Sequence, residues 1–407
     1  MFYWGIDWSE DHHNLCIRNE AGALMSRIEF ENSLSGFEQL EVERRKLGVA
    51  VSECLVAIET AHHLVVDYLL EQEYVVYIIS PRATDGYRSR QRSSGAHDDD
   101  SDAALLASIL RTDRASHRVW RPNNPLTQQM AVQLRLIESL RRSIHRQSNQ
   151  LRAALYRVHP RMLDWFSRVT TQIALEFLVA YPTAEEAQSL SREAFETFCH
   201  QHGYSRKDGM ALRYAQLQEP VPAAAPAMVQ AYRDTVRTLA QVLLPQVRYR
   251  LQALAQLDAW FDQHPDAFIF KSLPGTGDLL APGLLVKFGD HRDRFPTAAE
   301  VQALAGTCPV TERSGKRKLV KLRHGCDREF RHFAVQFARA SKLQSGWAAA
   351  YRQEIRPHCD SDAHADRILA NRWPLSCGDC GRTANRMMKP IIYTSAHSAA
   401  SRQHRLT

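Results

Sequence analysis

Apolar residues in the first eighty positions fall into short runs with the spacing of β-strands. Residues 2–8, 12–19 and 23–30 have strand-like composition and are joined by the turn sequences SED and NEAG, which predicts a three-stranded meander. A helical pattern then covers residues 34–46. Two continuous apolar runs typical of buried strands flank another helical pattern, in the order 54–60, 62–72 and 74–80.

A further helix is predicted over residues 99–111, so the order of elements is βββαβαβ followed by a helix. This order predicts an α/β domain with a mixed sheet, helices packed on its faces and the first strand at its centre. The arrangement is that of the RNase H-like superfamily, and the pattern alone also fits other α/β folds.

From Leu126 the apolar period becomes helical, and glutamine occupies two positions of a heptad seam. The seam residues are Leu126, Met130, Gln133, Ile137, Leu140, Ile144, Gln147 and Leu151. A second apolar run extends from Val229 to Leu257, and Pro245 is expected to kink or split its helix. The two runs predict either an antiparallel helical pair within one molecule or a coiled coil between molecules. Polar seam residues often set register and partner number, which favours the coiled coil.

Residues 170–227, between the two runs, are predicted to be helical and to end in the connector-like sequence EPVPAAAPA. Farther on, the sequence SLPGTGDLL places Gly275 and Gly277 at the start of a helix, where backbone N–H groups suit a phosphate oxygen. A single Gly-rich turn is a weak signal for such a site. The last roughly 30 residues lack periodicity, so we expect part of them to be poorly ordered.

Length and composition restrict the class of protein. A chain of 407 residues is long for one core and predicts two or three units. The 44% hydrophobic and 24% charged residues are typical of a soluble globular protein, and no apolar run is long enough to span a bilayer. The N-terminus lacks the layout of a signal peptide, so we expect a cytoplasmic protein with no membrane partner.

The eight cysteines are scattered, and in a cytoplasmic chain they are expected to be reduced thiols. Cys377 and Cys380 form a lone C-x-x-C. Apart from His358 and Cys359 there is no second pair of ligands for zinc, so a zinc site is not expected and the role of this motif stays open.

Positive charge is concentrated in two segments of a chain whose net charge is +7. Residues 311–407 carry 19 Lys and Arg against 8 Asp and Glu, and residues 111–170 carry 12 Arg against 3 acids. A basic helix face can simply be solvated. Two such segments, however, favour a partner with a phosphate backbone.

Acidic residues lie at the ends of the predicted strands and at the start of the helix that follows them. Asp7 ends the first strand, Glu59 ends the strand expected beside it, and Asp99 and Asp102 share a face in the first turn of the predicted helix. A turn would explain Asp7 alone, and helix capping would explain one or two of the helix acids. Neither explains four carboxylates at one sheet edge, an arrangement typical of hard divalent ions and two-metal phosphoryl transfer.

The sequences GIDWS, AIETA and DDSDAALLA, with Asp7, Glu59, Asp99 and Asp102, resemble the D-E-D-D tetrad of the DEDD transposases of bacterial insertion sequences, the bridge-RNA-guided serine recombinases. The resemblance continues over residues 273–318, which are similar to the C-terminal transposase domain of that family. One departure is His97-Asp98-Asp99, where the family usually has Lys-Thr-Asp. We assign Asp99 because the pair Asp102-Ala103 fixes the register.

The resemblance implies that Ser314, in TERSGKRKLVK, is a nucleophile that forms a covalent bond to DNA with help from the metal-bound carboxylates. A lone serine in a basic, Gly-containing loop is usually just solvated. A nucleophilic hydroxyl needs a base or metal and cations around the phosphate. The cations available here are Arg313, Lys316, Arg317 and Lys318.

The family further implies four segments and a set of partners. The segments are a RuvC-like, RNase H-like α/β domain at 1–112, a coiled-coil or linker segment at 113–264, a mainly helical transposase domain at 265–350 and a basic tail at 351–407. The partners are Mg²⁺ in a two-metal site, with Mn²⁺ as a substitute, donor and target DNA, a structured non-coding guide RNA and a homodimer or homotetramer acting at the bacterial nucleoid. Two rivals are a RuvC-like junction-resolving nuclease, which needs the tetrad and not Ser314, and a catalytically dead nucleic-acid-binding protein.

Overall fold

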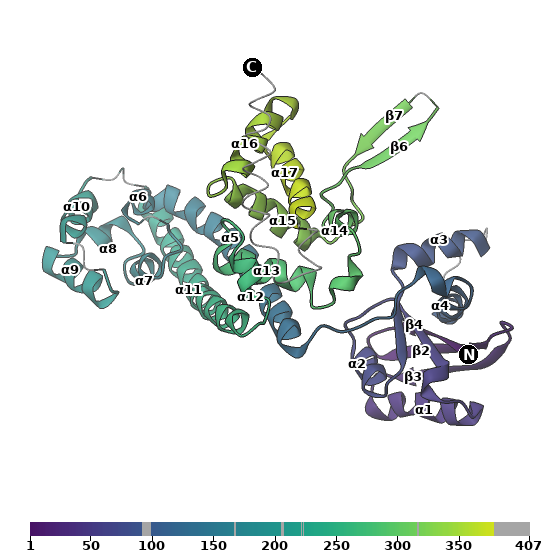
Figure 1. The fold of residues 1–407 in the computed structure, drawn as a ribbon. Coiled ribbons are helices and arrows are strands. Elements are labelled where there is room, and N and C mark those ends of the chain that lie inside the picture. The colour runs from purple at the N-terminus through teal and green to yellow at the C-terminus, as the bar shows by residue number, and fades with distance from the viewer. Residues whose placement is uncertain are drawn as a thin grey trace, which may run out of the picture. The chain divides into compact units, whose positions relative to one another are not determined.

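The computed structural model describes residues 1–377 with the exception of 92–98, 167, 205–206, 221, 223 and 316. The chain divides into two compact units, Met1–Pro122 and Asn123–Thr407 (Figure 1). Each described helix is too short or too polar to cross a bilayer.

The N-terminal unit contains a five-stranded mixed sheet in the order β3-β2-β1-β4-β5. Its strands are β1 (Phe2–Trp8), β2 (His12–Asn19), β3 (Leu24–Glu31), β4 (Cys54–Ile58) and β5 (Val75–Ile78). The central strand β1 runs antiparallel to β2 and parallel to β4. The predicted meander, the mixed sheet and the central position of the first strand are therefore confirmed, and the arrangement is consistent with an RNase H-like fold.

Helices cover both faces of this sheet because the side chains of a strand alternate between faces. Trp4 and Ile6 pack in a core with residues of α1 (Leu34–Leu47) and α2 (Leu64–Glu71). Tyr3 packs on the opposite face against α4 (Asp99–Asp113), the helix predicted over 99–111. The sequence pattern did not predict α3 (Pro81–Gln91), which precedes α4.

Two long helices, α5 (Pro125–Val158) and α11 (Pro226–Asp262), pack against each other in the second unit (Figure 1). The seam glutamines of α5 contact α11 of the same chain. Gln133 Nε2 donates to the Ala253 carbonyl at 3.1 Å, and Gln246 Nε2 donates to Gln147 Oε1 at 2.9 Å. Residue numbers fall along α11 as they rise along α5, so the pair is antiparallel and intramolecular. The preference for an intermolecular coiled coil was wrong for this seam, since a heptad pattern does not specify which chain supplies the partner.

Pro245 does not split α11, which is continuous from Pro226 to Asp262. A proline within a helix removes one backbone hydrogen bond and strains the preceding turn. Here Leu243 and Leu257, on either side of the proline, are both fully buried against neighbouring helices. This packing stabilises the helix across the proline.

The region between the long helices is helical, as predicted. It comprises α6 (Met162–Trp165), α7 (Gln172–Ala180), α8 (Ala184–Gln188), α9 (Arg192–Gln201) and α10 (Lys207–Leu217). Phe177 and Phe195 are buried among aromatic neighbours, and they pack in one core with Leu155 of α5 and Val236 of α11.

The C-terminal part of the second unit is mainly helical, with one hairpin. Its elements are α12 (Ala267–Lys271), α13 (Gly277–Phe288), α14 (Ala298–Leu304), β6 (Val310–Ser314), β7 (Arg317–Lys321), α15 (Arg328–Ser341), α16 (Gly346–Ile355) and α17 (Asp362–Cys377). Single-turn 3₁₀ helices lie at Val51–Glu53, Arg114–Ser116, Arg292–Arg294 and Arg356–His358, the last of these being η4. In Figure 1 the β6–β7 hairpin extends away from the helices of its own unit.

The prediction of a basic tail from residue 351 was wrong for residues 351–377. Trp373 and Leu369 of α17 are buried in the same core as Phe333 and Phe337 of α15. The indole Nε1 of Trp373 also donates to Ser341 Oγ at 3.0 Å. The apolar residues of this segment are few, and their burial becomes evident only when α15 lies beside them. The remainder of the predicted tail, 378–407, lies outside the described residues, as does Cys380.

A buried polar network fixes the N-terminus of α5 to the segment that follows α13. The Thr127 hydroxyl and His264 Nε2 each lie 3.0 Å from Asp290 Oδ1, and the Asn124 backbone N–H donates to Asp290 Oδ2 at 2.7 Å. The Asp266 backbone N–H donates to His264 Nδ1 at 3.1 Å, so Nε2 carries the proton that His264 donates to the carboxylate. The network is saturated within the protein, and we assign it a structural role.

Candidate active site at the carboxyl end of the central strands

Asp7 and Glu59 lie at the carboxyl ends of neighbouring parallel strands. In the β1–β4 register Tyr3 pairs with Leu55 and Gly5 with Ala57. Extending this register by two residues brings Asp7 opposite Glu59. Since side chains alternate along a strand, both carboxylates belong to the face of the sheet that α4 covers.

Gly5 allows the backbone of α4 to approach that face very closely. A Cβ atom built on Gly5 would lie 2.0 Å from the Ala103 carbonyl oxygen and 2.5 Å from the Ala107 nitrogen. Arg111, near the end of the same helix, lies 3.2 Å from a Cβ atom built on Gly22, in the turn after Asn19, which pairs with Phe2 at the start of β1. The helix therefore runs against the direction of β1, and its first turn, which holds Asp102, lies toward the end of the strand where Asp7 is found.

Helix α3 supplies two side chains to these carboxylates. The hydroxyl of Thr84, which is buried, donates to Glu59 Oε1 at 2.5 Å. Arg88, one turn later, donates from Nη2 to Asp102 Oδ1 at 2.8 Å and from Nη1 to Asp85 Oδ1 at 2.8 Å. The hydrogen bond to Asp102 raises the pKa of the Arg88 guanidinium, and the charges of Asp102, Asp85 and Glu59 add to the effect.

The structure thus brings three of the four predicted carboxylates to one end of the sheet, namely Asp7, Glu59 and Asp102. Asp99 begins α4, but its side chain lies outside the described residues, as does Asp98. Among the side chains that are described, no three His, Cys, Asp or Glu residues are grouped so that they could hold a metal ion. Glu59 and Asp102 are engaged by Thr84 and Arg88 instead. Both side chains nevertheless offer carboxylate oxygens near a positive charge, and carboxylate oxygens are the ligands that hard divalent ions prefer.

Sequence reasoning missed Gly5, Thr84 and Arg88. A lone glycine inside a strand of large residues marks the close approach of another backbone, which was the available signal for Gly5. Thr84 and Arg88 are four residues apart and so share a helix face. A cluster of carboxylates requires a cation nearby, and this requirement was the signal that pointed to Arg88 and to the helix face that it shares with Thr84.

Ser314 ends β6 and faces Arg317 across the hairpin. Sequence reasoning placed it in a loop, and the structure places it in a strand that pairs with β7. Both strands are almost entirely exposed, so they lack the buried face from which alternation is read. The turn begins at Gly315, whose φ of 57° lies in the left-handed region favoured by glycine.

The cations predicted around Ser314 lie on both faces of the hairpin. Because residues that pair directly share a face, Arg317 lies on the side of Ser314. Arg313 pairs with Lys318, and these two side chains belong to the opposite face. Lys316 lies outside the described residues.

Gly275 and Gly277 precede and begin α13, where the sequence predicted a helix start. Gly275 has a φ of 79°, and a Cβ atom there would lie 2.8 Å from the Ala340 backbone, so close packing against α15 explains this glycine. Gly277 has a φ of 54° and open space around it. A phosphate at this helix start stays a prediction.

Two family models match the chain. Residues 4–160 match the transposase family DEDD_Tnp_IS110, and residues 267–353 match the transposase IS116/IS110/IS902 family. The first match includes Asp7, Glu59 and Asp102, and the second includes Ser314.

Individual known proteins extend the similarity to transposases over most of the chain. The "Mini-circle putative transposase for IS117" of Streptomyces coelicolor is 27% identical over 406 residues, which are 97% of this chain and 98% of the relative. The "Putative transposase y4uE" of Sinorhizobium fredii is 26% identical over 265 residues, 65% of this chain and 73% of the relative. A protein of insertion element IS110 from S. coelicolor is 27% identical over 244 residues, 54% of each chain. In the two matched regions this chain is therefore similar to the DEDD_Tnp_IS110 and IS116/IS110/IS902 transposase families, and along nearly its whole length it is similar to a putative transposase for IS117.

Proposed function

We propose that this chain is an insertion-sequence transposase that exchanges DNA strands between a donor and a target. The observation that carries the proposal is the placement of Asp7, Glu59 and Asp102 at one end of the central strands, inside a region that matches the DEDD transposase model. The similarity to proteins named as transposases supports the same class of reaction.

In this proposal Asp7, Glu59, Asp99 and Asp102 hold Mg²⁺, with Mn²⁺ as a substitute. A pair of such ions, when bound, activates an attacking oxygen and stabilises the leaving one in phosphoryl transfer. Thr84 orients Glu59 through its hydrogen bond, and Arg88 lies where a cation offsets the repulsion between carboxylates.

Ser314 is the proposed nucleophile. Its hydroxyl oxygen would attack a DNA phosphorus, forming a serine–DNA phosphodiester, and the sugar oxygen that leaves would gain a proton as the serine loses one. The exposure of β6 and the cation beside Ser314, Arg317, support this role. Arg317 would stabilise the charge on the phosphate, with Arg313, Lys316 and Lys318 binding the DNA backbone around it.

The proposed partners are donor DNA, target DNA and a structured non-coding RNA that guides the choice between them, with the chain acting as a homodimer or homotetramer. The support for a nucleic-acid partner is the pair of basic segments, of which residues 311–407 carry 19 Lys and Arg against 8 acids. The guide RNA and the oligomer come from the family resemblance.

A recombination assay on a donor and a target plasmid tests the proposal. We expect Asp7→Ala and Glu59→Ala to abolish strand exchange, since each removes a carboxylate needed by the site and no buried apolar contact. Glu71→Ala is the matched control, because Glu71 is an exposed acid of the same unit at the end of α2. Thermal unfolding confirms that each variant is folded. Strand exchange at the parental rate in either Asp7→Ala or Glu59→Ala would reject the carboxylate site.

A further inference from the structure

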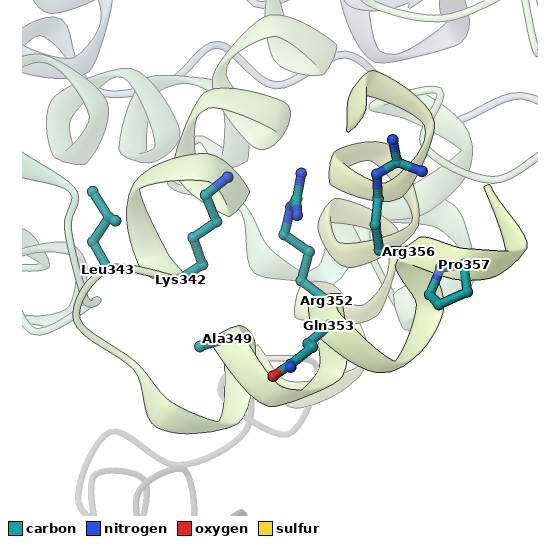
Figure 2. A pocket seen from close by; sticks show the side chains of 7 residues that line it. All are labelled: Lys342, Leu343, Ala349, Arg352, Gln353, Arg356 and Pro357. Carbon is teal, nitrogen blue, oxygen red and sulfur yellow. The ribbon is translucent and has the colours of Figure 1, made fainter. Parts of the chain in front are cut away.

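A pocket of about 380 Å³ opens beside the end of α15, along α16 and at η4 (Figure 2). It is lined by Lys342, Leu343, Ala349, Arg352, Gln353, Arg356 and Pro357. In Figure 2 the charged ends of Lys342, Arg352 and Arg356 extend to the same side of the helices. We call it the α15–α16 pocket.

Arg352 is held rigidly at the centre of this pocket. Its Nε donates to Asp366 Oδ1 at 2.8 Å and its Nη2 to Asp362 Oδ1 at 2.6 Å. Asp366 is only 3% exposed, and its other oxygen accepts from Arg339 Nε at 2.7 Å. Burial alone would raise the pKa of Asp366, but the hydrogen bonds from Arg352 and Arg339 outweigh it and lower that pKa. The buried carboxylate therefore stays ionised and fixes the orientation of the Arg352 guanidinium.

The charges within this ion-pair network do not balance. The four cations Arg339, Lys342, Arg352 and Arg356 share the two carboxylates of Asp362 and Asp366, which leaves two positive charges in excess.

The excess charge lies on Lys342 and Arg356. Lys342 Nζ is 3.9 Å from Asp366 Oδ1, beyond hydrogen-bond distance, and Arg356 shares with Arg352 an Asp362 side chain that is 69% exposed. Neither cation is needed to satisfy Asp366, which already accepts from two arginines. Arg356 donates to Asp362 Oδ1 at 2.9 Å and to the Cys359 carbonyl at 3.0 Å, which fix its position. Its charge, like that of Lys342, is offset only by a carboxylate that already pairs with another arginine.

The rest of the lining is apolar or neutral. Leu343 is 81% exposed, and Ala349 and Pro357 are also exposed. A nucleotide has this combination of properties, since its phosphate is anionic while its sugar and base present apolar surface. We infer that the α15–α16 pocket binds a phosphodiester of a nucleic-acid backbone through Lys342 and Arg356. The guanidinium of Arg352, whose orientation is fixed, lines the same site. The inference rests on the proposed function, because it takes the partner of the chain to be nucleic acid.

The test removes the two excess charges and keeps the Arg352–Asp366 pair. Fluorescence anisotropy of the full chain with a labelled duplex DNA, its single strand and an RNA of the same sequence gives affinity against salt concentration. If Lys342 and Arg356 each neutralise one phosphate, Lys342→Gln with Arg356→Gln should reduce the slope of log affinity against log salt by roughly 1.8 on duplex or roughly 1.4 on a single strand.

The matched control is Lys271→Gln with Arg192→Gln. Both residues belong to the same unit, are 49% and 64% exposed and form surface ion pairs away from the pocket, so this variant loses the same charge. We expect its slope to equal that of the parent. The probe on which the pocket variant loses slope identifies the bound polymer. An unchanged slope on all three probes, or an equal loss in the control, would overturn the inference and leave the proposed function standing. A parent chain that binds none of the probes would overturn both.

Discussion

Arg88 is a cation placed among carboxylates that the proposed reaction assigns to metal binding. Its guanidinium bridges Asp102 and Asp85, at 2.8 Å from each, and it is 18% exposed. A divalent ion that binds Asp102 must therefore displace this hydrogen bond or bind beside it. In either case the positive charge of Arg88 opposes the ion, while Asp85 remains available to hold the guanidinium.

We predict that Arg88→Ala binds Mg²⁺ or Mn²⁺ more tightly than the parent. Two charges 4 Å apart interact by about 4 kcal/mol at an effective dielectric constant of 20. Partial exposure reduces this repulsion, so we expect the midpoint metal concentration to fall by about tenfold, or about 1.4 kcal/mol. The midpoint is measured from the rise in melting temperature as metal is added.

The control for Arg88→Ala is Arg45→Ala, which removes an exposed positive charge from α1, on the other face of the sheet. It should leave the metal midpoint unchanged. Equal midpoints for the Arg88 and Arg45 variants would contradict the idea that Arg88 competes with metal at Asp102.

Among the individual residues of the candidate site, the sequence indicated the acidic ones and missed Thr84 and Arg88, which bind them. Asp7 and Glu59 were predictable because each lies at the carboxyl end of an apolar strand, and parallel neighbours end at the same sheet edge. Arg88 could not be assigned, since its role depends on how α3 packs beside α4. The faces of the β6–β7 hairpin could not be assigned either, because neither strand has an apolar side.

The contact between helix α4 and strand β1 determines the position of Asp102 relative to the sheet. Gly5 has no side chain, and the Ala103 carbonyl of α4 occupies the space that a Cβ atom would fill. Because both groups in this contact are backbone, a larger residue cannot be accommodated by a change of rotamer. The helix would have to move away from the sheet, and Asp102 would move with it.

We predict that Gly5→Ala lowers the free energy of unfolding by roughly 1–3 kcal/mol, the usual cost of overpacking a core. Gly86→Ala is a matched control, since a Cβ atom at Gly86, within α3, meets nothing within 4 Å. That change should be neutral or stabilising by up to about 1 kcal/mol. Urea unfolding gives the free energies, and hydrogen exchange of peptides from 99–113 reports on α4. Equal stability and equal exchange in the two variants would reject the close contact.

The strands and helices that sequence predicted correctly are those with a strong apolar pattern. The runs at 54–60 and 74–80 contain β4 and β5, and the heptad seam from Leu126 lies within α5. Helix α3 escaped prediction because its sequence, PRATDGYRSRQ, is mostly polar. The partner of α5 also escaped it, because an apolar stripe requires a neighbour without identifying which chain provides it.

At the scale of the whole molecule, the two proposed chemical functions lie in different compact units. Asp7, Glu59 and Asp102 belong to Met1–Pro122, and Ser314 belongs to Asn123–Thr407. The charge is also unequally divided. Residues 1–310 carry 33 Lys and Arg against 37 acids, while residues 311–407 carry the excess of cations. The segment with the proposed nucleophile is thus the one best suited to attract a polyanion.

If the two units act in one reaction, a change in either unit should prevent the same covalent step. We predict that Ser314→Ala keeps nearly full affinity for nucleic acid, since one exposed hydroxyl contributes at most about 1 kcal/mol, and loses all strand exchange. The parent should form a denaturation-resistant protein–DNA adduct on the peptide that contains Ser314, only with divalent metal, and Asp102→Ala should lose that adduct. Thr311→Ala is the control, because it removes a hydroxyl from the opposite face of the same strand. An adduct without the carboxylates would mean that the two sites act independently. Parental strand exchange by Ser314→Ala would instead assign the attack to water and favour a nuclease.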